Sequence, residues 1–311
     1  MSHGVVFASL RPPGGSFGAP IPISGRRATY YNLDMSSSGT AVMTWLSKRH
    51  HREKAFATAR PPGGQFGRSE LLARFGHRGV LYPFLDVNES GGAVIAWSGP
   101  KGDIAAVKDA GHSFRPAQLI PHSAFSTSDS SVAMAPNGTA IDIINGGPEA
   151  ENVRAAIRRP GRRFKRPVLV GNHNFAFGEI AADASNHFLL LMDTADSLGR
   201  ASDPVTRYYS NGSFGPPIRV FSVSPALFAV LGMNPAGDAV VSAIDNTYPA
   251  TTDYVMASYG HGGQSFEQSA FLSDALTEDK GFSEATMDGA GTALVSWIDN
   301  SGALVTSVGK P

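Results

Sequence analysis

The sequence contains no cysteine, no long apolar run and no net charge. Without cysteine there are no disulfides, no thiolate nucleophiles and no cysteine-ligated zinc. No apolar run approaches the roughly 18 residues of a membrane-spanning helix, so we expect no membrane span. The 26 basic residues balance the 26 acidic ones. Because no overall field attracts polyanions, this balance disfavours nucleic acid as a partner. We also expect a monomer.

The first residues, Met1-Ser2-His3-Gly4, carry neither the basic segment nor the apolar segment of a signal peptide. We therefore expect a cytoplasmic protein, or a secreted one if a signal peptide was removed. The lack of cysteine is compatible with both compartments.

Glycine and proline are abundant, with 35 and 21 residues in a chain of 311, and this composition favours many tight turns. A glycine-rich turn followed by phenylalanine recurs at intervals of 49, 48, 50, 50 and 52 residues. The phenylalanines are Phe17, Phe66, Phe114, Phe164, Phe214 and Phe266. A period near fifty residues indicates a repeat architecture.

A second marker keeps step with the first. It is a turn followed by an apolar strand that ends in tryptophan, over residues 39–45, 91–97 and 291–297. Weaker copies start at Gly138 and Gly237, and the copy near Asn186 lacks the glycine. Two markers in phase across six copies establish the repeat.

Each copy is predicted to hold four short strands, named A to D in chain order, with no helical period. The sequence therefore predicts an all-β fold, a six-bladed β-propeller of four-stranded antiparallel blades, over a single domain of residues 1–311. A parallel β-helix is the main competitor, but its repeat is shorter. The N-terminal residues 5–24 are expected to close the final blade, residues 281–308, which leaves one surplus C-type strand.

The element from Asp34 to Trp45 carries a resemblance to known repeats. Its turn and tryptophan resemble the repeats of sialidase-type and NHL-type propellers, over nearly the whole chain but at the level of the fold. The element departs from the sialidase Asp-box, in which tryptophan lies closer to the glycine, and no arginine triad can be placed. The resemblance therefore implies a propeller and carries over no catalytic residue.

Three motifs are better explained by the repeat than by function. Residues 14–18 match the G-x-S-x-G pattern of a nucleophile elbow, but the equivalent turn carries Gln65 in the next copy and no helix follows. The tryptophans Trp45, Trp97 and Trp297 share one strand position, where packing between blades is expected. The basic run at residues 158–166 falls on a C–D hairpin; it could bind phosphate or acidic polysaccharide, but a solvated outer rim is the simpler interpretation.

Function is expected at the face where the D–A and B–C loops converge over the central channel, because these segments differ between copies. The candidate acid–base residues there are His77, His122, His173, Glu179 and Glu284. The candidate ligand-binding residues are Arg27, Tyr30, Arg78, Tyr82, Asp129 and Asn174. Three histidines at similar positions of successive copies could bind a divalent metal with open positions, although a chance cluster is the simpler interpretation.

Two functions follow from these candidates. The first is a binding or scaffold module that holds a small molecule, glycan or peptide on the loop face. The alternative is a hydrolase or lyase that uses the histidines with Glu179 or Glu284. No cofactor is expected, apart from a possible divalent metal.

Overall fold

The computed structural model describes residues 4–12, 14–49, 52–76, 82–99, 102–121, 131–145, 152–171, 175–194, 204–221, 226–245, 252–274, 276–277 and 283–309. All secondary structure in these residues is β-strand, as the absence of a helical period predicts. Within the same residues no helix is long and apolar enough to cross a membrane.

The strands form a series of antiparallel sheets, each made from consecutive strands. We number them as blades 1 to 6. Blade 1 contains β3 (Ala28–Met35), β4 (Ala41–Arg49), β5 (Arg52–Arg60) and β6 (Glu70–Phe75). Blade 2 contains β7 (Phe84–Val87), β8 (Ala93–Gly99), β9 (Gly102–Lys108) and β10 (Gln118–Leu119). Blade 3 contains β11 (Ser131–Met134), β12 (Ala140–Asn145), β13 (Val153–Arg158) and β14 (Val168–Gly171).

The later blades differ in their outer strands. Blade 4 contains β15 (Phe175–Ala182), β16 (Phe188–Thr194) and β17 (Val205–Ser210), with β18 (Ser213–Phe214) and β19 (Ile218–Arg219) both paired to β17. Blade 5 contains β20 (Ala226–Met233), β21 (Asp238–Asp245) and β22 (Thr252–His261), with β23 (Ala270–Phe271) and β24 (Leu276–Thr277) both paired to β22. Blade 6 contains β25 (Ser283–Met287), β26 (Ala293–Ile298) and β27 (Leu304–Gly309). The N-terminal β1 (Phe7–Ala8) and β2 (Ile21–Pro22) pair with each other.

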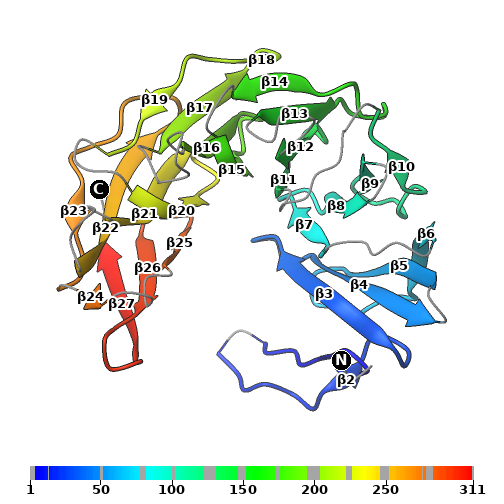
Figure 1. Cartoon of the computed structure of the whole chain (residues 1–311). Coiled ribbons are helices and arrows are strands. Elements are labelled where there is room, and N and C mark those ends of the chain that lie inside the picture. Colours follow the sequence, from blue (N-terminus) through cyan, green and yellow to red (C-terminus); the bar gives the residue numbers. More distant parts are fainter. Residues whose placement is uncertain are drawn as a thin grey trace.

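The blades follow one another around an arc, with the first strand of each blade innermost and the last strand outermost (Figure 1). The N-terminal hairpin and blade 6 lie at the two ends of this arc (Figure 1). The number of sheets is consistent with six blades.

The second strand of each blade forms much of the core. Strand β8 is buried along its whole length. Trp45, Trp97 and Trp297 are 3%, 0% and 5% exposed, so the structure confirms that they are core residues and not a ligand platform. The apolar clusters lie between neighbouring blades, as in the cluster that joins Leu46 and Ala57 of blade 1 to Val87 and Trp97 of blade 2. Burial between blades therefore holds the arc together.

Polar contacts join the inner strands of neighbouring blades. In four interfaces a side chain of the earlier blade accepts a hydrogen bond from a backbone N–H of the later blade. These pairs are Asp34 with Val87 at 2.6 Å, Asp86 with Met134 at 2.6 Å, Ser131 with Ile180 at 3.1 Å, and Glu179 with Leu231 at 2.8 Å. At the fifth interface the hydroxyls of Ser242 and Ser283 are 2.9 Å apart.

The end of the arc differs from the expected closure. Among the described residues, β27 has β26 as its one strand partner, and β2 pairs with β1. The N-terminal hairpin instead lies beside blade 1, where the N–H of Ala28 donates to the carbonyl of Gly4 at 3.0 Å. Strand β1 thus occupies the edge of β2 that the repeat assigns to the third strand of blade 6, β27. Closure of residues 281–308 by residues 5–24 therefore stays a prediction.

Candidate functional site

The start of β3 lies on the loop face and has an unusual backbone. Arg27 and Tyr30 have positive φ angles of 75° and 47°. The register of β3 against β4 shifts between Thr29 and Tyr31, so Tyr30 is the extra residue of a β-bulge. A bulky residue in the left-handed region costs on the order of 1–3 kcal/mol, and such conformations concentrate at functional sites.

The bulge brings Tyr30 against Tyr82, which precedes the inner strand of blade 2. The two ring centroids are 4.3 Å apart and the rings are nearly perpendicular, at 74°. Tyr30 also packs on the core between blades 1 and 2, whereas Tyr82 is 57% exposed. The amide of Asn32 donates to the carbonyl of Pro83 at 3.1 Å and so ties the Tyr82 segment to blade 1. The structure thus joins two of the predicted ligand-binding residues into one exposed aromatic pair, the Tyr30–Tyr82 pair.

The two candidate carboxylates occupy equivalent positions of their inner strands. Glu179 lies opposite Leu191 in blade 4, and Glu284 lies opposite Ser296 in blade 6. The Glu179 carboxylate accepts the Leu231 hydrogen bond described above, so it links blade 4 to blade 5. Glu284 is exposed. A role in acid–base chemistry stays a prediction for both.

The remaining predicted residues lie outside the described part of the chain. They are His77, Arg78, His122, Asp129, His173 and Asn174. Whether the three histidines converge, and whether they bind a divalent metal, therefore stay predictions. Within the described residues, no group of three or more histidine, aspartate or glutamate side chains could hold a metal ion.

The opposite end of the central opening is acidic. A cavity of about 340 Å³ is lined by the inner strands and the A–B turns of all six blades, and Asp34, Asp86, Glu89 and Asp183 contribute to its wall. Burial raises the pKa of Asp86 to about 7, and the nearby Asp34 carboxylate adds to the shift. Burial also raises the pKa of Asp34. Both carboxylates accept a backbone hydrogen bond from the next blade, so their first role is to join blades.

A cavity of about 920 Å³ lies at the open end of the arc between the N-terminal segment and β3. Its wall includes side chains that are more than half exposed. These are Phe7, Phe17, Tyr31, Leu33 and Met35. In the other blades the corresponding face of the inner strand is covered by a neighbour. This cavity is therefore an uncovered blade face, and we do not assign it as the ligand site.

A pair of buried aspartates lies between blades 2 and 3. Asp103 on β9 and Asp142 on β12 are both 0% exposed. Burial raises the pKa of Asp103 to about 6. The pKa of Asp142 is raised well above its usual value by burial and by the Asp103 charge. Neither Asp142 oxygen has a hydrogen-bond partner among the described residues.

Comparison with known proteins identifies the fold. No protein-family model and no curated protein sequence matches the chain. A solved ulvan lyase of family PL25, bound to -[GlcA(1-4)Rha3S]-, is similar with a TM-score of 0.53 and 10% identity over 94% of this chain and 84% of that chain. The GH93 α-L-arabinofuranosidase of Fusarium graminearum with arabinobiose has a TM-score of 0.52 and 11% identity over 91% of this chain and 93% of that chain.

The β-propeller domain of the trilobed protease from Pyrococcus furiosus, reported to have an open velcro topology, has a TM-score of 0.53 and 8% identity. This match covers 91% of this chain and 82% of that chain. At such identities the likeness concerns the fold alone. The chain is a β-propeller protein, as its repeat and its resemblance to propeller families predicted.

Sequence reasoning missed the residues that join the blades. Asp34 and Asp86 both stand five residues before the turn glycine, at Gly39 and Gly91, and this repeated spacing was a readable signal. No comparable signal marks Asp142, which no other copy of the repeat matches with an acid. Its burial follows from the packing of blade 2 against blade 3, which one sequence does not show.

Proposed function

We propose that the protein is a glycan-binding propeller whose loop face receives a sugar at the Tyr30–Tyr82 pair. The observation that carries this proposal is the exposed ring of Tyr82, held edge to face against a tyrosine in a strained bulge. An aromatic ring offers an apolar face to the C–H groups of a sugar, while its hydroxyl offers a hydrogen bond.

Supporting chemistry lies next to the pair. Arg27 is exposed at the start of the same strand, and its guanidinium can donate hydrogen bonds to sugar hydroxyls or to a uronate. Two of the solved propellers that resemble the chain are glycan complexes, one with -[GlcA(1-4)Rha3S]- and one with arabinobiose. A fixed aromatic pair beside a flexible cation is typical of a binding site, because the rings need no ordering when the ligand arrives.

The test is a glycan array followed by calorimetric titration of any glycan that binds, with the Tyr82→Ala variant beside the natural chain. We expect Tyr82→Ala to raise the dissociation constant about tenfold, as the loss of one aromatic contact predicts. Phe271→Ala is the matched control, because Phe271 is 55% exposed and forms a similar T-shaped pair with Tyr254 on the outer strands of blade 5.

The control should bind the glycan as the natural chain does. The proposal is wrong if the array shows no binding by the natural chain, or if Tyr82→Ala binds with unchanged affinity. Binding of a peptide in place of any glycan at this site would also contradict it.

A further inference from the structure

A second recess lies on the outer rim, away from the loop face. A groove of about 610 Å³ runs between the outer segments of blades 2 and 3. Arg115 forms one wall, Arg162 and Arg163 form the other, and Val107 and Phe164 lie in the floor. The basic hairpin at residues 158–166 was expected to stand alone on a solvated rim. The structure instead gives it a facing wall on the neighbouring blade.

The positive charges of this hairpin are not required by the repeat. Its turn has the same backbone as the turn of blade 1, since the N–H of Lys165 donates to Ile157 just as the N–H of Gly67 donates to Ala59. Four basic residues replace neutral ones at matching positions. Arg159, Arg162, Arg163 and Lys165 stand where blade 1 has Pro61, Gly64, Gln65 and Gly67. The fold therefore forms without these charges.

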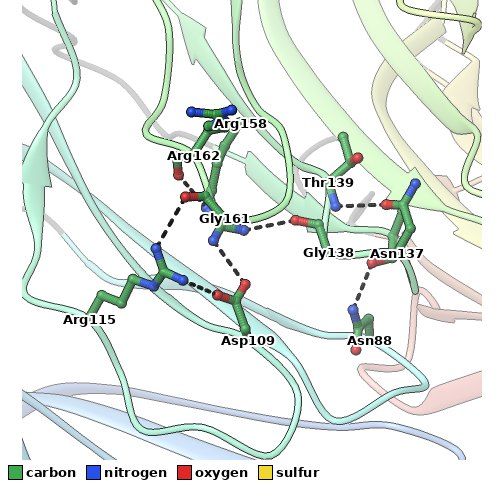
Figure 2. Close-up of polar contacts among 10 residues, drawn as sticks. Asn88, Asp109, Arg115, Asn137, Gly138, Thr139, Arg158, Gly161 and Arg162 are labelled. Atoms are coloured by element: carbon green, nitrogen blue, oxygen red, sulfur yellow. Dashed lines mark hydrogen bonds and ion pairs between the residues drawn. The ribbon is translucent and has the colours of Figure 1, made fainter.

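One aspartate aligns the two walls of the groove. Asp109 accepts from the guanidinium of Arg158 at 2.8 Å and, through its other oxygen, from Arg115 at 2.8 Å (Figure 2). Arg158 is 2% exposed and also donates to the carbonyls of Gly138 and Arg162 (Figure 2). Arg115 in turn donates to the carbonyl of Gly161 at 3.4 Å, which holds it beside the hairpin.

The exposed cations outnumber the acid that could neutralise them. Both oxygens of Asp109 are used by Arg158 and Arg115. In the described part of the chain, Arg162, Arg163 and Lys165 make no ion pair, and all three are exposed. Guanidinium groups bind sulfate and carboxylate through two parallel hydrogen bonds, so this arrangement suits an anionic ligand.

We propose that this groove binds an acidic polysaccharide that carries sulfate or uronate groups. The site is distinct from the Tyr30–Tyr82 pair and does not depend on the proposed function. An acidic saccharide is favoured over nucleic acid because the aromatic side chain that lines the groove, Phe164, is only 3% exposed and offers no surface for base stacking.

The test replaces the surplus charges by the residues that blade 1 carries at the same positions. The variant Arg162→Gly, Arg163→Gln, Lys165→Gly is compared with the natural chain by titration against four probes of similar length. They are a size-defined heparin oligosaccharide with sulfates and uronates, a hyaluronan oligosaccharide with uronates alone, and single-stranded and duplex DNA.

We expect the natural chain to bind heparin, and the variant to bind it about tenfold to a hundredfold more weakly, with a smaller dependence on salt. If hyaluronan binds, carboxylate groups are sufficient for recognition by the groove. If heparin alone binds, recognition requires sulfate groups. The control Arg52→Gln, Arg68→Gln, Arg74→Gln removes the same charge from exposed positions of blade 1 and should leave binding unchanged.

Three results would overturn the proposal. One is that neither saccharide binds the natural chain. Another is an equal loss of affinity in the control and in the groove variant, which would show a general charge effect. The third is binding of DNA without binding of either saccharide, which would assign the groove to nucleic acid.

Discussion

Asp142 is a fully buried carboxyl group that faces a second buried carboxyl group, Asp103. Two unshielded charges at such a place would be costly, so the pKa of each group is raised, and we infer that the pair shares a proton. A carboxyl group with a raised folded-state pKa binds more protons in the folded state than in the unfolded state. Its contribution to stability is therefore full below about pH 4 and is lost as the pH rises through the folded pKa.

We expect Asp142→Asn to raise the free energy of unfolding at pH 8 by about 1–2 kcal/mol, because it removes a buried acid without changing its shape. At pH 4 the gain should disappear, since the natural side chain is then protonated. Urea denaturation of the variant and the natural chain at pH 8 and at pH 4 measures the change in the free energy of unfolding at each pH. A variant that is less stable than the natural chain at pH 8 would contradict the shared-proton interpretation.

Asp238→Asn is a control, because the contribution of Asp238 to stability changes with pH in the opposite direction. Hydrogen bonds from Asn234 and His261 lower the pKa of Asp238. Its contribution to stability is present above the unfolded pKa and is lost as the pH falls through the folded value. We expect its replacement to destabilise the protein at pH 8.

At the scale of strands and hairpins, the ion pair between Asp109 and Arg158 joins blade 2 to the C–D hairpin of blade 3. We expect Asp109→Ala to lower the free energy of unfolding by about 3 kcal/mol, because it leaves the buried guanidinium of Arg158 without its counter-charge. Arg115→Gln should change stability by less than about 0.5 kcal/mol, since Arg115 is 54% exposed. Chemical denaturation of both variants measures the two changes in the free energy of unfolding. Equal changes would show that the burial of an arginine does not decide how much its ion pair contributes to stability.

The same hairpin shows what one sequence can and cannot predict. The repeat predicted the strands, the turns and the burial of Trp45, because periodic apolar positions and glycine turns act locally. It did not predict that Arg158 is buried in the structure while Arg162 is exposed. That distinction depends on Asp109, which is 49 residues away in sequence and lies on the preceding blade.

The loop face shows the same limit. Arg27, Tyr30 and Tyr82 were selected because their segments do not repeat. The structure shows that Tyr30 and Tyr82 touch and that Tyr30 lies in a bulge. A positive φ at a tyrosine has no signature in the sequence, since residue preferences alone argue against it.

At the scale of the whole molecule, the two ends of the arc expose complementary features. Blade 6 presents Leu304 and Val308, which are 69% and 66% exposed. Glu284 of blade 6 occupies the position that Glu179 has in blade 4, where the Glu179 carboxylate accepts a hydrogen bond from the N–H of Leu231. The equivalent residue of blade 1 is Leu33, on the uncovered face of β3. We propose that the ring closes here, with β2 as the fourth strand of blade 6.

The repeat fixes the register of this closure. In blade 1, Glu70 lies opposite Ala57, and the matching positions are Ile21 and Thr306. Because Ile21 lies opposite Ala8 of β1 in the N-terminal hairpin, closure in this register requires β27 to take the place of β1 on β2. We expect the double variant Ile21→Cys, Thr306→Cys to form an intramolecular disulfide on mild oxidation, which a shift in gel mobility and mass spectrometry would detect. The chain has no other cysteine, so no other disulfide can form within one chain. Disulfide-linked dimers, or thiols that stay free, would contradict closure within one chain.

In four interfaces an N–H of the later blade donates to a side chain of the earlier one, whereas the amide of Asn32 in blade 1 donates to the carbonyl of Pro83 before blade 2. Domains are made from the N-terminus, and repeat proteins gain stability from each added neighbour. Each blade that leaves the ribosome therefore meets an acceptor on a blade already made. Each of these contacts needs only two adjacent blades, so the protein can assemble from its N-terminus one blade at a time.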